Sequence, residues 1–319
     1  MRTLFLIQKE QRVILDRFYD SICHYLGDCD LRRLSSAEQG DLKGYFKQID
    51  VESYDRIILF LRFKKEIRQV RFIRSIPNLV ILEHDANQNY TEGKYRGKFS
   101  AHYRQLPWAR IINSGYEVSE KLKQEGFDSV FVPKGYDQVL LKNNAQERDI
   151  ELGFVGSVEH KTYKKRKELL QTLGETEGLV LARTHSGEDY LEMLNRIKIF
   201  VGADIGFGEY MIKNFEAMAC GCLLMTWSQG ESENRALGFE DMKNVVLFNT
   251  LDELREKLML LRNTLGLIDA IASSGQRLAE SHFSWERLGE EVAEAVKVPL
   301  RRKVVKHCLG FKRYTWERP

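Results

Sequence analysis

One stretch decides the fold class: Phe200-Val-Gly-Ala-Asp-Ile-Gly-Phe-Gly-Glu-Tyr-Met-Ile-Lys-Asn-Phe-Glu-Ala-Met-Ala-Cys-Gly-Cys-Leu-Leu-Met-Thr-Trp227. A strand is expected to end near Ala203, a glycine-containing loop follows, and a helix is expected to begin near Ile212. Gly221 ends that helix, and the apolar run Leu223–Trp227 begins the next strand. This order predicts a parallel sheet. The helix start exposes backbone N–H groups and a positive dipole end, which suit a diphosphate, although simple packing also explains one crossover among several.

The same alternation of short apolar runs and helix-like stretches extends through most of the chain. Several runs are continuously apolar, as expected for strands with helices on both faces. Helices are expected at Val118–Glu125, which Gly126 ends, from Thr250 to about Arg262, and from Ser284 onward. The fold class is therefore α/β. The expected strands are Thr3–Ile7, Arg56–Leu61, Leu79–Glu83, Ala109–Asn113, Ser129–Val132, Glu151–Val155, Gly178–Ala182, Ile199–Ala203, Leu223–Trp227 and Val245–Phe248.

The composition of the 319 residues is that of a globular protein. Hydrophobic residues make up 43% and charged residues 30%, with 23 Gly and 5 Pro, which excludes disordered and collagen-like chains. The longest apolar runs, such as Ile57–Leu61, fall far short of the roughly 20 residues that span a membrane. The N-terminus predicts a first strand rather than a signal peptide. Five scattered Cys do not make a disulfide framework, so a soluble cytoplasmic protein is expected.

A polar segment without periodicity, residues 138–149, is the expected linker between two domains, 1–138 and 149–296. Because ligands bind beyond the carboxyl ends of strands in open α/β sheets, the cleft between the domains is the expected site. Residues 297–319 carry eight Lys/Arg and one Glu, a charge of +7, so the rest of the chain sums to −4. This basic tail is expected to cross back onto the N-terminal domain, to meet an anionic surface, or to do both.

The motif Phe215-Glu-Ala-Met-Ala-Cys-Gly221, followed by an apolar strand, resembles the signature of group-1, family-4-like glycosyltransferases of the GT-B fold. Other segments of that family occur in the same order. Leu152-Gly-Phe-Val-Gly-Ser157 is similar to the first strand and turn of the family's second domain, and Val80-Ile-Leu-Glu-His-Asp85 to a strand-end His that faces the transferred sugar. Val130-Phe-Val-Pro-Lys-Gly-Tyr-Asp137 resembles the end of the first domain. The resemblance covers roughly residues 78–290 and is nearest to the spore-maturation-protein-like branch.

The resemblance implies two facing Rossmann-like domains in the GT-B arrangement, with an acceptor bound by the N-terminal domain and a nucleotide-sugar donor by the C-terminal domain. It implies no cofactor, because the nucleotide sugar is a substrate, and no metal; nucleic acid is not expected as a partner. The implied catalytic residues are His84, Asp85 and Glu209. A strand-end His such as His84 is also common as a structural residue. The implied donor-binding residues are Gly156, Ser157, Lys161, Arg166, Lys213, Asn214 and Glu216.

Three departures from the family pattern matter. The family's paired glutamates would require Glu at position 208, but the chain has Gly208 with Glu209 one place on, so only Glu216 carries over. The glycine turn after the first strand is absent. The Gly-Arg pair that opens the second domain is replaced by Gly-Ser, and a run of cations follows it. That run either forms a solvated helix face or supplies one cation to the donor diphosphate, with Lys161 and Arg166 as the candidates.

Two further motifs suggest metals only weakly. Asp28-Cys-Asp30 has the form with which the other major glycosyltransferase fold holds Mn²⁺ or Mg²⁺, but it is expected in a loop near the N-terminus. Cys220-Gly-Cys222 has a single intervening residue and no matching pair elsewhere, so a zinc site is not expected.

Two basic segments suggest an anionic partner. In residues 62–74, three cations recur at helical spacing, either as a solvated helix face or as a patch for anionic lipid or a phosphorylated acceptor. They are Lys64, Arg68 and Arg71. In the tail, four residues at helical spacing are expected to share a face, and aromatic residues suited to a membrane boundary follow. The four are Leu300, Val304, His307 and Cys308, and the aromatic residues are Phe311, Tyr314 and Trp316.

We therefore expect a glycosyltransferase that moves a sugar from a nucleotide-diphosphate donor to a glycan or lipid-linked acceptor, with retention and without metal. Helix-end N–H groups and cations would stabilise the charge on the leaving phosphate by about 2–4 kcal/mol for each contact. The expected pathway is the synthesis of a bacterial surface glycan such as lipopolysaccharide, at the inner face of the cytoplasmic membrane. Two alternatives stay open: a non-catalytic GT-B paralogue that recruits a partner, which the missing glutamate and glycine turn favour, and a nucleotide-sugar epimerase.

Overall fold

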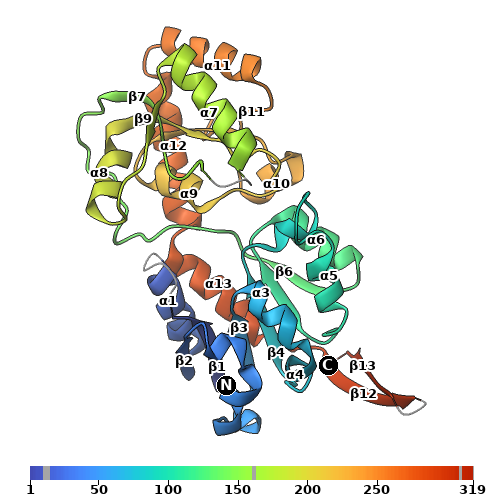
Figure 1. Ribbon diagram of the computed structural model, residues 1–319. Coiled ribbons are helices and arrows are strands. Elements are labelled where there is room, and N and C mark those ends of the chain that lie inside the picture. The colour runs from blue at the N-terminus through green and yellow to red at the C-terminus, as the bar shows by residue number, and fades with distance from the viewer. Residues whose placement is uncertain (10–14, 160–162, 309–310, 319) are drawn as a thin grey trace. The chain divides into compact units, whose positions relative to one another are not determined.

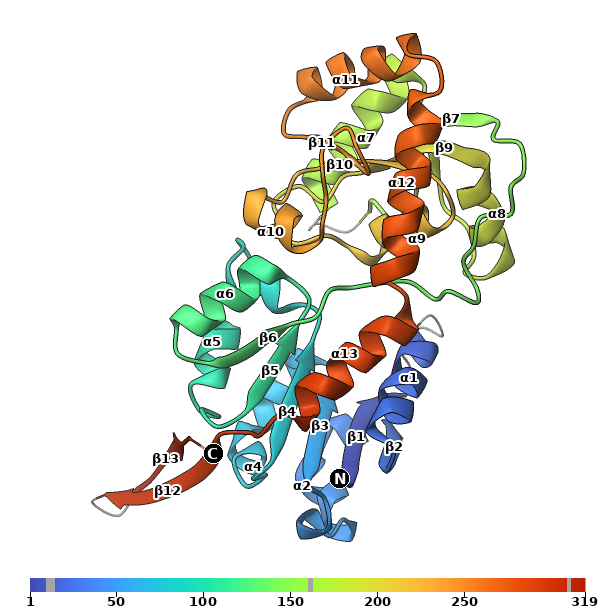
Figure 2. The same ribbon diagram turned by 180° about the vertical axis from the view of Figure 1, so that it is seen from behind.

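The structure is a computed structural model that describes residues 1–9, 15–159, 163–308 and 311–318. The chain folds into two compact units (Figure 1, Figure 2). The first unit combines Met1–Pro133 with the C-terminal segment Leu288–Pro319, and the second unit is Lys134–Arg287. Each unit is an α/β fold around a parallel sheet of its own, as the alternation of apolar runs and helical stretches predicts.

Six parallel strands form the sheet of the first unit, in the order β2-β1-β3-β4-β5-β6. The strands β1, β3, β4 and β5 are buried almost throughout, because both faces of the sheet are covered, and they therefore read as unbroken apolar runs. Five of the six lie where the sequence predicts a strand. The six are β1 (Thr3–Gln8), β2 (Cys29–Leu34), β3 (Arg56–Phe60), β4 (Leu79–Glu83), β5 (Arg110–Asn113) and β6 (Asp128–Phe131).

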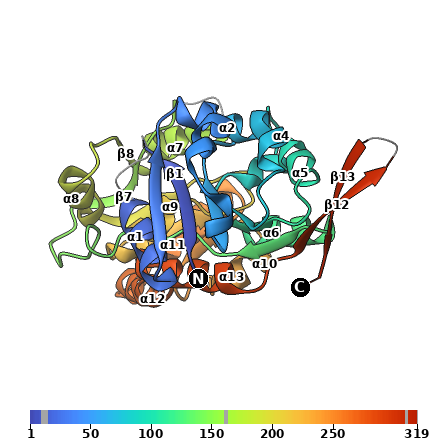
Figure 3. The ribbon, with the colours of Figure 1, turned by 90° about the horizontal axis from the view of Figure 1, so that it is seen from below.

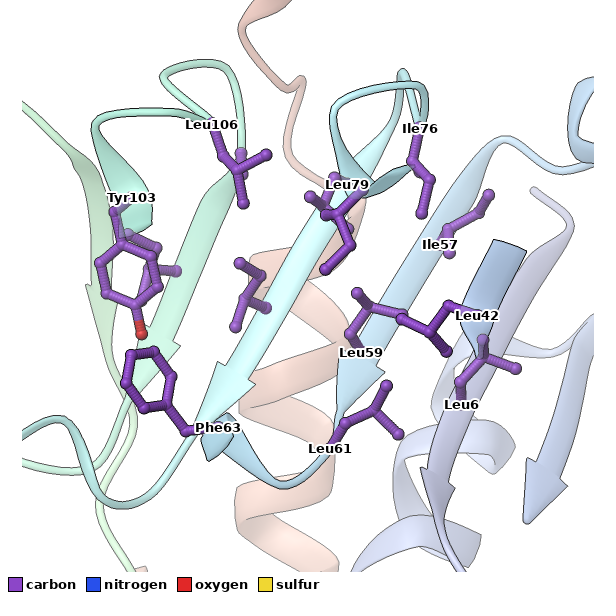
Figure 4. Close-up of a cluster of buried hydrophobic side chains, with 14 of the residues drawn as sticks. Leu6, Leu42, Ile57, Leu59, Leu61, Phe63, Ile76, Leu79, Tyr103 and Leu106 are labelled. Carbon is purple, nitrogen blue, oxygen red and sulfur yellow. The ribbon is translucent and has the colours of Figure 1, made fainter. Parts of the chain in front are cut away.

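The core of the first unit lies between its sheet and the helices on one face. Leu6, Leu59, Leu79 and Tyr103 belong to a cluster of buried side chains on that face (Figure 4). The helices of this unit are α1 (Asp16–Leu26), α2 (Leu42–Tyr45), α3 (Phe63–Glu66), α4 (Val70–Ile73), α5 (Lys98–Tyr103), α6 (Tyr116–Gln124) and, from Leu288 onward, α13 (Trp285–Lys297).

The returning helix α13 lies on the opposite face of the same sheet (Figure 2, Figure 4). Leu288, Val292 and Val296 recur at every fourth position and are fully buried, which stabilises the fold by about 1.5–3 kcal/mol for each side chain. At the end of the helix, Arg110 Nη1 donates to Ala295 O over 2.7 Å. A guanidinium here satisfies a carbonyl that the helix end leaves unpaired. The C-terminal segment is therefore a structural part of the first unit.

Five parallel strands form the sheet of the second unit, in the order β11-β10-β9-β7-β8, and all five lie where the sequence predicts a strand. The helix expected from Thr250 is confirmed, and the side chain of Thr250 caps it by accepting from Glu253 N–H over 3.1 Å. The strands are β7 (Ile150–Val155), β8 (Val180–Ala182), β9 (Ile197–Gly202), β10 (Leu223–Trp227) and β11 (Val246–Phe248). The helices are α7 (Lys164–Glu177), α8 (Glu188–Arg196), α9 (Ile212–Ala219), α10 (Glu231–Ala236), α11 (Leu251–Asn263) and α12 (Leu267–His282).

Both sheets reverse their strand order beside their first strand. In the first unit β1 lies between β2 and β3, and in the second unit β7 lies between β8 and β9. In open α/β sheets ligands bind at such a switch point, beyond the carboxyl ends of the strands. The fold of the second unit therefore points to the turn that follows β7 and to the loop between β9 and α9.

The polar segment 138–149, expected as the linker between domains, lies inside the second unit. Asn144 N–H donates to Asn195 Oδ1 over 2.7 Å, and Arg148 Nη1 donates to Ile197 O over 2.6 Å. The chain passes between the units at Pro133–Lys134 and again at Arg287–Leu288, so the boundaries differ from the expected 138, 149 and 296. Low hydrophobicity marks a surface segment, but it does not reveal to which unit the segment's hydrogen bonds go.

The strand β2 lies where the sequence predicts a loop. It is an edge strand that pairs only with β1, and Leu34 is its one buried residue, so it lacks an apolar run. The carboxylate of Asp30 accepts from Arg32 and from the hydroxyl of Tyr54, each over 2.6 Å. The turn between α1 and β2 also brings Cys23 and Cys29 together as a disulfide, with Cα atoms 5.2 Å apart.

The basic segment 62–74 does not form one continuous helix. Its residues form α3, a 3₁₀ turn at Ile67–Gln69 and α4 in succession. Its three cations at helical spacing, Lys64, Arg68 and Arg71, are all exposed, as a surface helix would place them.

The basic tail forms a β-hairpin instead of presenting a helical face. The strands β12 (Arg302–Cys308) and β13 (Phe311–Glu317) are antiparallel, and Figure 3 shows them projecting from the rest of the first unit. Several β-branched and aromatic residues, which favour strands over helices, explain the difference. They are Val304, Val305, Tyr314, Thr315 and Trp316.

No described helix is long and apolar enough to cross a membrane.

Candidate functional site

The carboxyl end of β7 lies against the start of α9. Gly156 follows β7 with a φ of 156°, and its N–H donates to Ala182 O over 3.0 Å. A Cβ at this position would lie 2.8 Å from Cε of Lys213, the second residue of α9. Only glycine allows this approach without displacing the lysine. Ser157, next in the chain, is half-buried. The switch point thus brings together three of the expected donor-binding residues.

Tyr190, from α8, connects Lys213 to a further expected residue, Glu216. The ammonium of Lys213 lies 4.6 Å from the centroid of the Tyr190 ring and 3.4 Å from its hydroxyl. That hydroxyl donates to Glu216 Oε2 over 2.5 Å. Burial, and next the negative charge of Glu216, raise the pKa of Tyr190 well above its usual value, so the phenol stays protonated and donates. Tyr190 therefore holds the buried Glu216 carboxylate beside a cation.

A buried carboxylate fixes the first turn of α9. Asp204 follows β9, and its Oδ2 accepts from Met211 N–H over 3.1 Å and from Asn214 Nδ2 over 2.6 Å. Its Oδ1 accepts from Arg166 Nη2 over 2.5 Å. A side-chain oxygen that accepts from an N–H at a helix start has the effect of an N-cap. Asp204 thereby sets where α9 begins.

Arg166, on α7, is enclosed by aromatic rings. Its guanidinium lies 4.3 Å from the ring centroid of Tyr163, 5.4 Å from that of Phe207 and 5.6 Å from that of Phe154. The residue is only 6% exposed and is paired with Asp204, whereas Lys164 and Lys165 of the same helix are exposed. The expected role of Arg166 in donor binding remains a prediction. Because its guanidinium is paired with Asp204, we expect Arg166 to act by holding that carboxylate in place. Lys161, the other candidate, lies outside the described residues.

Glu209 is buried in the loop between β9 and α9. Lys134 Nζ lies 2.9 Å from Glu209 Oε1, and the two side chains are 4% and 2% exposed. The loop turns at Gly208, whose φ is 71° and whose N–H donates to Gln229 Oε1 over 2.9 Å. Removal of either partner of such a buried ion pair strongly destabilises the fold, because it leaves the other charge buried and unpaired. The structure thus gives the expected catalytic carboxylate a specific cationic partner.

His84 and Asp85 follow β4 in the first unit. The ring of His84 stacks on Phe18 with centroids 5.8 Å apart and meets the edge of Phe60 at 5.0 Å. Asp85 is exposed, and its N–H donates to Glu83 Oε1 over 2.8 Å. Both residues stand at the carboxyl edge of the sheet, where ligands bind in such folds.

Sequence reasoning missed three residues of the second-unit site: Tyr190, Asp204 and Lys134. Only Asp204 has a readable signal, since it is a carboxylate directly after a buried strand and just ahead of a helix start. Tyr190 and Lys134 come from separate segments, and the fold alone brings them to the site. The structure also joins five expected donor-binding residues into this one site, and they are Gly156, Ser157, Lys213, Asn214 and Glu216.

Metal-ligating residues do not gather anywhere in the described part of the chain. No three or more His, Cys, Asp or Glu residues lie there in a group that could hold a metal ion. Cys220 and Cys222 are buried, and burial raises the pKa of Cys222 to about 12, so its thiol stays protonated at neutral pH.

Comparison with known proteins gives a consistent result. Residues 138–294 match the family model described as glycosyl transferase-like. No curated protein matches the chain in sequence. The solved structures that share its fold include HepE from Anabaena in complex with UDP and glucose, with a TM-score of 0.69 and 15% identity over 94% of this chain and 100% of that one.

Two other solved structures are similar. Sucrose-phosphate synthase from Thermosynechococcus elongatus has a TM-score of 0.65 and 10% identity over 92% of this chain and 98% of that one. WaaG, a glycosyltransferase involved in lipopolysaccharide biosynthesis, has a TM-score of 0.59 and 12% identity over 93% of this chain and 100% of that one. These likenesses show a fold of two Rossmann-like domains. With the family match over residues 138–294 and the motif at residues 215–221, they support a group 1 glycosyltransferase of the GT-B fold.

Proposed function

We propose that the second unit binds a nucleotide-diphosphate-sugar donor and that the first unit binds a glycan or lipid-linked acceptor. The proposal rests on contacts at the switch point of the second sheet. The Gly156 backbone lies against Lys213, and the hydroxyl of Tyr190 joins Lys213 to Glu216. A close backbone turn, a cation and a helix start suit a diphosphate. A buried carboxylate beside them suits the hydroxyl groups of a ribose.

In the reaction we infer, the bond from the anomeric carbon to the donor phosphate breaks and an acceptor oxygen bonds to that carbon. The acceptor proton is released, and the nucleoside diphosphate leaves. Lys213 and the N–H groups of the first turn of α9 stabilise the negative charge that grows on the leaving diphosphate, by about 2–4 kcal/mol for each well-placed donor. Retention of configuration and independence of metal follow from the group resemblance and remain predictions.

We infer that His84 and Asp85 hold the transferred sugar or the acceptor, since both stand at the carboxyl edge of the first sheet. Glu209 acts beside Lys134, whose ammonium lies 2.9 Å from its carboxylate and fixes it in place. UDP is the donor nucleotide to test first, because HepE binds UDP and glucose. The pathway we infer is a bacterial surface glycan such as lipopolysaccharide, made at the inner face of the cytoplasmic membrane.

A non-catalytic GT-B protein that recruits a partner is the second candidate. It is favoured by Gly208 at the place of the family's first glutamate and by the burial of Glu209 against Lys134. Release of glucose from UDP-glucose, or transfer to an acceptor, separates the two functions. A protein that binds UDP but neither hydrolyses nor transfers any sugar donor fits the second candidate.

Glu216→Ala is the direct test of the donor site. Loss of a carboxylate that accepts hydrogen bonds from ribose should cost about 1.5–3 kcal/mol, which weakens UDP binding tenfold or more. Isothermal titration calorimetry with UDP measures the effect, and Glu192→Ala, an exposed residue of α8, is the matched control. Equal UDP affinity in wild type and Glu216→Ala, with both folded, would show that this carboxylate does not bind the donor.

A further inference from the structure

Two basic segments far apart in the sequence form one surface on the first unit. The hairpin β12–β13 lies beside the segment that contains α4, and the views in Figure 1 and Figure 2 agree on this. The guanidinium of Arg74, directly after α4, lies 5.5 Å from the ring centroid of Tyr314, and Lys303 Nζ donates to Arg74 O. The sequence shows each segment separately, but only the fold joins them.

One side of the hairpin is fixed to the first unit. The rings of Tyr314 and Trp108 lie 5.8 Å apart, and the Lys303 ammonium lies 4.8 Å from the Trp108 ring centroid. Arg301 lies 4.0 Å from the ring centroid of Trp316 and donates to the carbonyl at position 126 over 2.8 Å. Arg301 and Lys303 therefore anchor the hairpin and are not free to meet a partner.

The other cations of the hairpin face solvent. Arg302, Lys306, Lys312 and Arg313 are all exposed. Lys306 stands directly opposite Arg313 in the strand register, and like charges in that position are destabilising. A two-stranded hairpin is also only marginally stable in water by itself. An anionic partner would relieve this repulsion.

The segment 63–74 enlarges the positively charged surface of the hairpin. Its exposed Lys64, Arg68 and Arg71 add to the four exposed cations of the hairpin, and Glu317 is the one exposed carboxylate among the described residues of the two segments. Val305, opposite Tyr314 in the strand register, is 39% exposed, and Tyr314 and Trp316 are half-buried. Cations mixed with aliphatic and aromatic side chains suit the headgroup boundary of a bilayer.

We propose that this surface docks the protein on a bilayer that contains anionic phospholipid. We call it the hairpin surface, and it comprises Lys64, Arg68, Arg71, Arg302, Lys306, Lys312 and Arg313. The proposal deepens the proposed function and rests on it, because a lipid-linked acceptor is found at such a bilayer. The surface belongs to the first unit, which is the unit inferred to bind the acceptor.

Vesicle sedimentation tests the hairpin surface. Wild type should bind vesicles that contain 30% phosphatidylglycerol at 0.1 M salt and be released at 1 M salt, where the screening length falls from about 10 Å to about 3 Å. Each basic residue contributes about a fivefold factor. The variant R302Q/K306Q/K312Q/R313Q should therefore lower the partition coefficient at least a hundredfold. The variant K64Q/R68Q/R71Q should lower it by about a hundredfold, and it leaves the hairpin untouched.

The control is a matched variant in the second unit, K198Q/R235Q/K243Q/R277Q, which changes four exposed cations and should bind vesicles as wild type does. Thermal stabilisation by UDP should be unchanged in all three variants, so failure to bind lipid is distinguishable from failure of the donor site. Indifference of wild type to phosphatidylglycerol would overturn the proposal. Equal loss in the control, or binding of heparin or RNA without binding of vesicles, would overturn it as well.

Discussion

Arg166→Met is the change that best tests how the proposed donor site is built. The guanidinium of Arg166 and the carboxylate of Asp204 are 7% and 4% exposed and lie 2.5 Å apart. Methionine fills a similar volume among the rings of Tyr163, Phe207 and Phe154 but leaves Asp204 buried without its cation. Breaking a buried pair in this way costs about 3–5 kcal/mol.

The cost should appear as a lower melting temperature. For a unit of about 150 residues, 1 kcal/mol corresponds to about 2–4 °C, so Arg166→Met should melt about 6–20 °C below wild type. Differential scanning calorimetry measures this shift. Lys165→Met is the control on the same helix, because its side chain is exposed, and it should shift the melting temperature by less than about 2 °C.

UDP affinity distinguishes a positioning role from direct contact. If Arg166 acts through Asp204, UDP should bind more weakly because Met211 and Asn214 lose their fixed partner, and Asp204→Asn should weaken binding in the same way. Arg166→Lys should lie between wild type and Arg166→Met, since lysine keeps the charge but not the planar fork. A normal melting temperature in Arg166→Met together with a more than tenfold loss of UDP affinity would refute this reasoning. The guanidinium would then contact the donor itself.

Two further results are expected. Tyr190→Phe should raise the KM for the sugar donor by about two- to thirteenfold with a smaller change in kcat, because Glu216 and Lys213 lose a hydroxyl that orients them, at about 0.5–1.5 kcal/mol. Steady-state kinetics measures this, and an unchanged KM would contradict it. Activity should survive excess EDTA, and Asp30→Asn should leave it intact while lowering stability at neutral pH. The hydrogen bond from Arg32 holds the pKa of Asp30 below its usual range. The stability difference between Asp30→Asn and wild type should therefore be full above about pH 4 and vanish as the pH falls further, which urea unfolding measures. Activity that EDTA abolishes and only Mn²⁺ restores would contradict the expected independence of metal.

The parts of the fold that sequence predicts are those with a local signal. Ten of the strands lie where the sequence predicts a strand, and the central ones, such as β1, β3 and β4, read as unbroken apolar runs because both of their faces are covered. The strand β2 escapes detection because it is an edge strand with one buried residue. The sequence does not predict the hairpin β12–β13, because its apolar residues also fit a helical spacing. Short segments carry too few residues to distinguish the helical period of 3.6 from the strand period of 2.

The site divides in the same way between local and long-range information. Gly156, Lys213 and Glu216 stand in motifs that a single stretch of sequence contains, so resemblance finds them. Tyr190 and Lys134 enter through contacts with Glu216 and Glu209 across many residues. No periodicity or spacing records such a contact. The partners that hold functional side chains in place are therefore the part of the site that only the fold supplies.

The departure at position 208 has a structural reason. Gly208 adopts a φ of 71°, a left-handed conformation that a glutamate would adopt only with strain. The same residue donates its N–H to Gln229 Oε1, which fixes the turn. The loop thus requires glycine where the family has a carboxylate, and the next residue, Glu209, supplies one that is buried against Lys134. The loop between β9 and α9 therefore combines a turn that suits glycine with a carboxylate, one residue later, that is buried beside Lys134.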